Sequence, residues 1–183
     1  MNFPTFLTLL RIFIIPLLVA VYYLPIESKY LICAGLFGIA ALTDWLDGFL
    51  ARRWNQMTAF GAFLDPVADK LMVAVALGVL IEAHASWVLT LPALVIIGRE
   101  IVISALREWM AELGKSANVA VSWLGKVKTS FQMLSIFLLL LTPPDASLVW
   151  VGLVVLYIAA FLTLWSMYSY LRAAKPYILP NKA

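Results

Sequence analysis

Long uncharged stretches alternate with short polar segments along the whole chain. Their limits are 12–26, 30–43, 71–81, 83–98, 129–144 and 146–171. A helix needs about 20 residues to cross the hydrocarbon core of a bilayer, so most of these stretches must include charged residues at one end to span it. The pattern therefore predicts six transmembrane helices, at 6–24, 30–53, 58–81, 86–111, 123–142 and 147–171.

The composition agrees with a protein that lives in a membrane. Of the 183 residues, 64% are hydrophobic and 13% are charged, whereas soluble domains have about 45–50% and 25%. A chain with so few polar residues cannot cover its helices with a surface that water tolerates. The single cysteine, Cys33, excludes a disulfide framework. We therefore expect an all-α, polytopic membrane protein in which residues 1–183 form one domain.

Basic residues gather on one side of the predicted membrane. The connections near 27, 83 and 145 carry Lys29 as their one basic residue. The opposite side carries Arg52, Arg53, Lys115, Lys126, Lys128, Arg172, Lys175 and Lys182. By the positive-inside rule, both termini are expected in the cytoplasm. The net charge of +3 is too small for a surface that binds nucleic acid.

Charged residues also intrude into the predicted helices at the cytoplasmic ends. A charge at the centre of a membrane helix costs about 2.5–3.5 kcal/mol on insertion scales, so such residues need a polar environment. Five helices contribute them if Arg11 is included, which favours a water-accessible cavity that opens toward the cytoplasm. Snorkelling to the interface is the alternative for lysine and arginine, but aspartate is too short for it.

Four of the intruding residues are aspartates on two consecutive helices. Asp44 and Asp47 lie three residues apart near the end of the second helix, and Asp65 and Asp69 lie four apart near the start of the third. Each pair shares a helix face. If the two helices form an antiparallel hairpin, Asp47 faces Asp65 and Asp44 faces Asp69. The pattern thus predicts a cluster of four carboxylates.

Such a cluster needs positive charge to remain ionised. Two carboxylates 4 Å apart repel by about 4 kcal/mol at an effective dielectric constant of 20. Oxygen ligands without histidine or cysteine favour Mg²⁺, with Mn²⁺ or Ca²⁺ as substitutes. Four carboxylates suit a pair of metal ions, an arrangement used for displacement at phosphorus. A cation pathway or a proton relay is the alternative for the same cluster.

Small residues accompany the aspartates. Gly48 and Ala51 follow Asp47, and Gly61 precedes Asp65, so backbone is accessible to a flat ligand beside the carboxylates. Tight packing of membrane helices is the alternative explanation for each small residue taken singly.

Together these residues form the pattern DxxDGxxAR, eight further residues, then GxxxDxxxD, with eight fixed residues across positions 44–69. The pattern resembles the complete signature of the CDP-alcohol phosphotransferases. The segments NFPTFLTLLR, GREIVISALREWMAELGK and GKVKT, at 2–11, 98–115 and 125–129, are similar to those of bacterial members that use glycerol 3-phosphate.

The resemblance implies a six-helix enzyme of the bacterial inner membrane, usually a homodimer, with its active site at the cytoplasmic face. It implies that CDP-diacylglycerol donates a phosphatidyl group to sn-glycerol 3-phosphate, with CMP as the other product. Its metal ligands would be Asp44, Asp47, Asp65 and Asp69, of which Asp69 would also be the general base. Residues near the CDP-lipid would be Thr8, Gly48, Ala51, Arg52 and Thr58.

The phosphate of such an acceptor needs cations apart from the metal site. Arg107 lies on a stripe of the fourth helix with Glu100 and Ser104, Arg99 lies a step around, and Lys126 begins the fifth helix. We expect Arg99, Arg107 and Lys126 to form a phosphate clamp, since guanidinium groups pair well with phosphate oxygens. Ion pairing with neighbouring glutamates is the alternative.

Two classes of alternative function stay open from the sequence. Within the family, the acceptor could instead be serine, inositol phosphate or phosphatidylglycerol. Outside it, the carboxylates could line the pathway of a divalent-cation carrier, although Gly48, Ala51 and Arg52 have no obvious role in one.

Overall fold

The computed structural model consists of α-helices and describes residues 3–54, 59–114 and 123–178. Its helices are α1 (Phe3–Tyr23), α2 (Lys29–Trp54), α3 (Ala59–His84), α4 (Trp87–Glu112), α5 (Trp123–Leu141) and α6 (Val149–Ile178). Helices suit a chain this apolar because each satisfies its backbone hydrogen bonds internally, without water. Within these described residues, the all-α prediction and the number of six helices are confirmed.

Helix limits differ from the predicted ones mainly where charge was taken as the end of a helix. α6 continues to Ile178 instead of ending at 171, and passes Arg172 and Lys175. Backbone hydrogen bonding needs no apolar side chains, so a helix can extend beyond its apolar segment into polar surroundings.

Gly114, with φ of 68°, follows the last turn of α4, as expected for a residue past a helix C-terminus.

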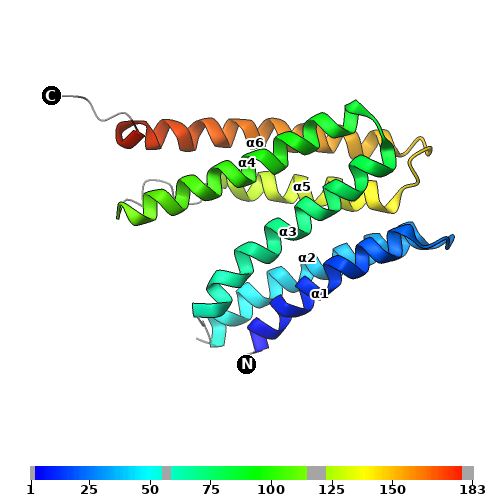
Figure 1. Cartoon of the computed structure of the whole chain (residues 1–183), viewed down its shortest axis with the longest axis horizontal. Helices are drawn as coiled ribbons and strands as arrows, with labels where there is room; N and C mark the ends of the chain where they lie inside the picture. Colours follow the sequence, from blue (N-terminus) through cyan, green and yellow to red (C-terminus); the bar gives the residue numbers. More distant parts are fainter. Residues whose placement is uncertain (1–2, 55–58, 115–122, 179–183) are drawn as a thin grey trace.

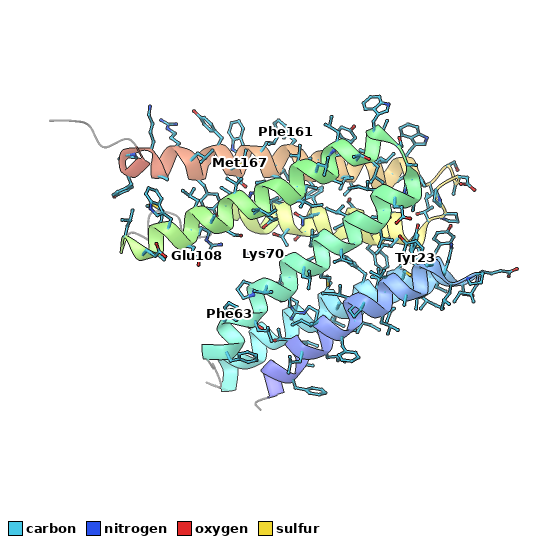
Figure 2. All side chains as sticks on the ribbon, in the orientation of Figure 1. Tyr23, Phe63, Lys70, Glu108, Phe161 and Met167 are labelled. Atoms are coloured by element: carbon cyan, nitrogen blue, oxygen red, sulfur yellow. The ribbon has the colours of Figure 1, made fainter. Side chains whose placement is uncertain are left out.

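Three helices among the described residues are long and apolar enough to cross a membrane. These are Phe6–Tyr23, Trp87–Glu112 and Val149–Tyr177, while Val127–Leu141 is a shorter apolar helix. Apolar side chains such as Phe63 and Phe161 are mostly exposed along the helices (Figure 2). Exposed apolar surface of this extent is expected where lipid replaces water as the solvent. The crossing of the remaining helices stays a prediction.

The helices form two groups that α3 connects. α1 and α2 lie side by side, α4 and α5 each pack against α6, and α3 runs obliquely between the groups (Figure 1). α1 contacts both α2 and α3, whereas α2 and α3 touch each other little. The predicted hairpin is therefore more open than two adjacent antiparallel helices, because α1 packs against both of its members. α5 joins the groups by contacting α2, α3 and α6.

The core lies where these helices meet, away from the polar ends. Phe37 of α2, Leu77 of α3, Ile136 of α5 and Leu156 of α6 are at most 1% exposed. Arg11, Arg99 and Lys128 are also buried. Buried charge is tolerated only with partners, so these cations direct attention to what surrounds them.

Candidate active site

One side of the site is built by α1 against three aspartates. Thr8 and Arg11 are three residues apart on α1 and so share a face. The Thr8 hydroxyl donates a hydrogen bond to Oδ1 of Asp65. Nη1 of Arg11 lies 2.9 Å from Oδ1 of Asp44 and also pairs with Oδ1 of Asp69.

Arg11 thus brings Asp44 and Asp69 together across the opening between α2 and α3. Its side chain has no exposed surface, while those of Asp44 and Asp69 are 37% and 40% exposed. The positive charge expected between the carboxylates is supplied in this structure by a guanidinium group of the chain itself. The two carboxylates keep an open side, which faces a pocket.

The donor atoms at this end fit a hard divalent cation. The described acidic side chains here offer carboxylate oxygens and no nitrogen or sulfur ligand, as Mg²⁺ prefers. No group of three or more acidic, histidine or cysteine side chains within the described part of the chain is close enough to hold an ion. The side chain of Asp47 lies outside the described residues. Three of the four predicted carboxylate ligands, those of Asp44, Asp65 and Asp69, are therefore found at this site.

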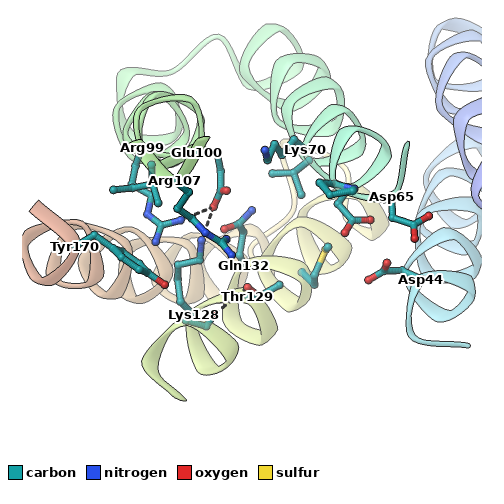
Figure 3. Close-up of a pocket in the computed structure, with 16 residues that line it drawn as sticks. Asp44, Asp65, Lys70, Arg99, Glu100, Arg107, Lys128, Thr129, Gln132 and Tyr170 are labelled. Carbon is teal, nitrogen blue, oxygen red and sulfur yellow. Dashed lines mark hydrogen bonds and ion pairs between the residues drawn. The ribbon is translucent and has the colours of Figure 1, made fainter. Parts of the chain in front are cut away.

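The pocket has a volume of about 340 Å³ and is lined by residues from α2 to α6. That volume lies within the range of small-molecule sites. Asp44, Asp65 and Asp69 line one part of it. Arg99, Arg107 and Lys128 line another (Figure 3). A single cavity therefore offers both a carboxylate group and a cationic group.

At the cationic part, Arg99 is held from several sides. Its Nη2 donates to Oγ of Ser166 at 2.7 Å, and its Nη1 lies 3.1 Å from Oε1 of Glu100. The guanidinium carbon lies 5.7 Å from the centre of the Tyr170 ring, within the range of a cation–π contact. Arg99 therefore links α4 to α6 as well as lining the pocket. Arg99 thus makes an ion pair with a neighbouring glutamate, which is the alternative to the phosphate clamp that the sequence left open.

The other two cations at this part of the pocket, Lys128 and Arg107, differ in burial and in ion pairing. Lys128 is 4% exposed and pairs with Oε1 of Glu100. Arg107 is exposed, lines the pocket, and makes no ion pair with any described side chain. Of Arg99, Arg107 and Lys128, Arg107 is thus the cation most available to an incoming anion. The side chain of Lys126 lies outside the described residues.

The residues expected near a CDP-lipid are mostly outside the described side chains. Gly48, Ala51 and Arg52 belong to α2, but their side chains are not described, and Thr58 lies outside the described residues altogether. Thr8 is fully buried and bonded to Asp65, so in this structure it supports the carboxylates.

Sequence reasoning missed two functions that the structure suggests. Arg11 was noted as an intruding charge but not as the partner of Asp44 and Asp69. Lys128 is among the basic residues of the predicted cytoplasmic side, but the predicted clamp does not include it. The available signal was the same in both cases, because each cation lies at the edge of an apolar run, where burial requires a partner.

The fold and this pocket define a membrane protein with an acidic and a basic group in one cavity, and comparison with known proteins gives the family. The model of the CDP-alcohol phosphatidyltransferase family matches residues 1–165. The chain belongs to this family.

Similar proteins are known from several bacteria. The chain is 59% identical to a protein of Pectobacterium atrosepticum over 174 residues, which cover 95% of each chain. It is 58% identical to a protein of Sodalis glossinidius, over 96% of each chain, and 58% identical to one of Salmonella choleraesuis, over 95% of each. All three relatives are called CDP-diacylglycerol--glycerol-3-phosphate 3-phosphatidyltransferase.

Proposed function

We propose that the protein transfers the phosphatidyl group of CDP-diacylglycerol to sn-glycerol 3-phosphate, giving phosphatidylglycerophosphate and CMP. Relatives that cover nearly the whole chain at 58–59% identity carry this activity in their names. The observation that carries the proposal is the pocket, in which carboxylates suited to metal-assisted phosphoryl chemistry share one cavity with cations suited to a phosphate.

The carboxylate part would bind the donor's pyrophosphate through metal. Mg²⁺, or Mn²⁺ as a substitute, would be held by the carboxylates of Asp44, Asp47, Asp65 and Asp69. We expect two ions at this site. When bound, the ions would neutralise the negative charge that accumulates as CMP departs. Gly48, Ala51, Arg52 and Thr58 would lie along the CDP group. Thr8 would orient Asp65 through its hydrogen bond.

Asp69 would act as the general base. The 1-hydroxyl of glycerol 3-phosphate loses its proton to the Asp69 carboxylate as its oxygen forms a bond to the phosphorus that carries diacylglycerol. The bond from that phosphorus to the CMP oxygen breaks, and CMP leaves with the electron pair. Asp69 is suited to this because its side chain is 40% exposed and lines the pocket.

The basic part would bind the acceptor's phosphate. Arg107 would contribute a guanidinium group that pairs with two phosphate oxygens. Arg99 and Lys128, which line the same wall, would add positive charge while Glu100 keeps them in place. Lys126 stays a predicted member of the clamp.

We also propose the membrane arrangement that this chemistry needs. All six helices would cross the bacterial inner membrane, with both termini and the pocket at the cytoplasmic side, where basic residues are concentrated. The acyl chains of the donor would remain in lipid while its CDP group meets a soluble acceptor at the boundary. Homodimerisation is a prediction that rests on the family resemblance alone.

An acceptor panel tests the proposal. Purified protein is incubated with CDP-diacylglycerol, Mg²⁺ and one alcohol at a time, and released CMP is measured. The alcohols are glycerol 3-phosphate, serine, inositol phosphate and phosphatidylglycerol. We expect release with glycerol 3-phosphate to exceed that with the others, and faster release with serine or another alcohol would refute the choice of acceptor. Ion flux into liposomes without any CMP would favour the cation carrier instead.

A further inference from the structure

A buried amide in the pocket has an unused hydrogen-bond acceptor. Gln132 of α5 lines the pocket and is 3% exposed. Its Oε1 is buried without a hydrogen-bond partner among the described residues. Most buried polar side-chain atoms in proteins have a partner, and an unsatisfied one costs about 1–3 kcal/mol. A buried acceptor on a pocket-lining residue that has no partner among the described residues indicates a ligand that donates a hydrogen bond.

The position of Gln132 narrows the kind of ligand group. Gln132 follows Lys128 by four residues on α5, so the two share a helix face. Figure 3 shows Gln132 in the middle of the pocket, with Arg107 and Lys128 to one side and Asp65 to the other. A molecule that spans from the cations to the aspartates therefore passes Gln132 between its two ends.

We propose that Gln132 accepts a hydrogen bond from the 2-hydroxyl of the acceptor and so selects a vicinal diol phosphate. The inference rests on the proposed function, in which the phosphate lies at Arg107 and the 1-hydroxyl at Asp69. The 2-hydroxyl is the one remaining donor, and it lies between those two groups on the acceptor's carbon chain. A dianionic phosphate has no proton to donate, so it cannot satisfy Oε1.

Other buried oxygens without partners do not compete for this role. Oγ of Ser135 and Oγ1 of Thr163 also lack hydrogen-bond partners among the described residues, but neither residue lines the pocket. Ser135 lies one helical turn beyond Gln132 on α5 and is fully buried. It is therefore a matched control, since it shares the helix and the burial of Gln132 but not its access to the pocket.

The test compares two acceptors in wild-type protein and in Gln132→Met, which preserves length and removes the amide. The acceptors are glycerol 3-phosphate and 3-hydroxypropyl phosphate, which lacks the 2-hydroxyl and is otherwise alike. In wild type we expect kcat/KM for glycerol 3-phosphate to be higher by about 10- to 100-fold, the range for leaving a buried acceptor unsatisfied. In Gln132→Met, kcat/KM should fall by about that factor with glycerol 3-phosphate and change little with the deoxy acceptor. The ratio of the two kcat/KM values should therefore approach one.

Additional variants make the result independent of a folding defect. Gln132→Asn retains an amide but withdraws its carbonyl, and should lower the preference without abolishing turnover of the deoxy acceptor. Ser135→Ala should preserve the wild-type preference. An equal loss with both acceptors in Gln132→Met, or no preference in wild type, overturns the proposal while leaving the transferase activity standing. Absence of CMP release from wild type with glycerol 3-phosphate overturns the proposed function as well.

Discussion

Replacement of Arg11 tests whether this residue neutralises the carboxylates. Arg11→Met keeps most of the length of the side chain and removes the charge that Asp44 and Asp69 share. Breaking a fully buried ion pair from one side costs about 3–5 kcal/mol, and breaking an exposed pair costs less than about 1 kcal/mol. Arg11 has no exposed surface but the aspartates are 37% and 40% exposed, which places the cost near 2 kcal/mol.

The assay is thermal unfolding of the purified protein in detergent, with EDTA and with saturating Mg²⁺. For a chain of this size, about 2 kcal/mol corresponds to a fall in Tm of about 4–8 °C. We expect that fall in EDTA, because the two carboxylates are then left without a counter-charge. In Mg²⁺ the fall should be less than half as large, because a bound divalent cation replaces the missing charge.

The test compares the fall in Tm measured in EDTA with the fall measured in Mg²⁺. Lys29→Met is the control, because Lys29 lies over the rings of Tyr22 and Tyr30, at 5.4 and 5.2 Å, and makes no ion pair with a described aspartate. Its effect on Tm should be the same in EDTA and in Mg²⁺. If Arg11→Met also lowers Tm equally in both, Arg11 and the metal do not neutralise the same carboxylates and the reasoning is wrong.

Three further predictions follow from the same structure. Asp69→Asn should lower CMP release by about 10²–10⁴-fold, because it removes the base, while the protein elutes normally from a sizing column; near-normal turnover would eliminate Asp69 as the base. Arg107→Ala should raise KM for glycerol 3-phosphate about tenfold or more, with KM for CDP-diacylglycerol little changed; an unaltered acceptor KM would remove Arg107 from the clamp. Gly152→Ala should destabilise the α5–α6 contact by about 1–3 kcal/mol, since its Cβ would lie 2.7 Å from Cγ of Leu139. Gly78→Ala, where a Cβ would meet nothing within 4 Å, is the control for that loss of Tm.

The helices could be predicted closely because their signal is local. A membrane helix is specified by a run of apolar residues, and its start and end are marked by turn residues such as Pro25 and Gly114. The packing of α1 between α2 and α3 could not be predicted. It depends on side-chain fit between segments far apart in the chain, which hydropathy does not encode.

The site could be predicted only in part, for a related reason. The spacing within each pair, Asp44 with Asp47 and Asp65 with Asp69, indicated that the two members share a helix face, because helical periodicity fixes faces within one element. The bridge that Arg11 makes between them requires a third helix at a definite depth and rotation. Likewise, Lys128 and Gln132 belong to the pocket because of the way α5 crosses α3, and one sequence without its tertiary contacts carries no such information.

The central claim is that divalent ions bind among the aspartates of α2 and α3. It is tested most directly by anomalous scattering from crystals of the protein grown with Mn²⁺. We predict one or two anomalous peaks bounded by the four signature carboxylates, namely those of Asp44, Asp47, Asp65 and Asp69. Crystals of active protein that show no peak at these carboxylates would contradict the account.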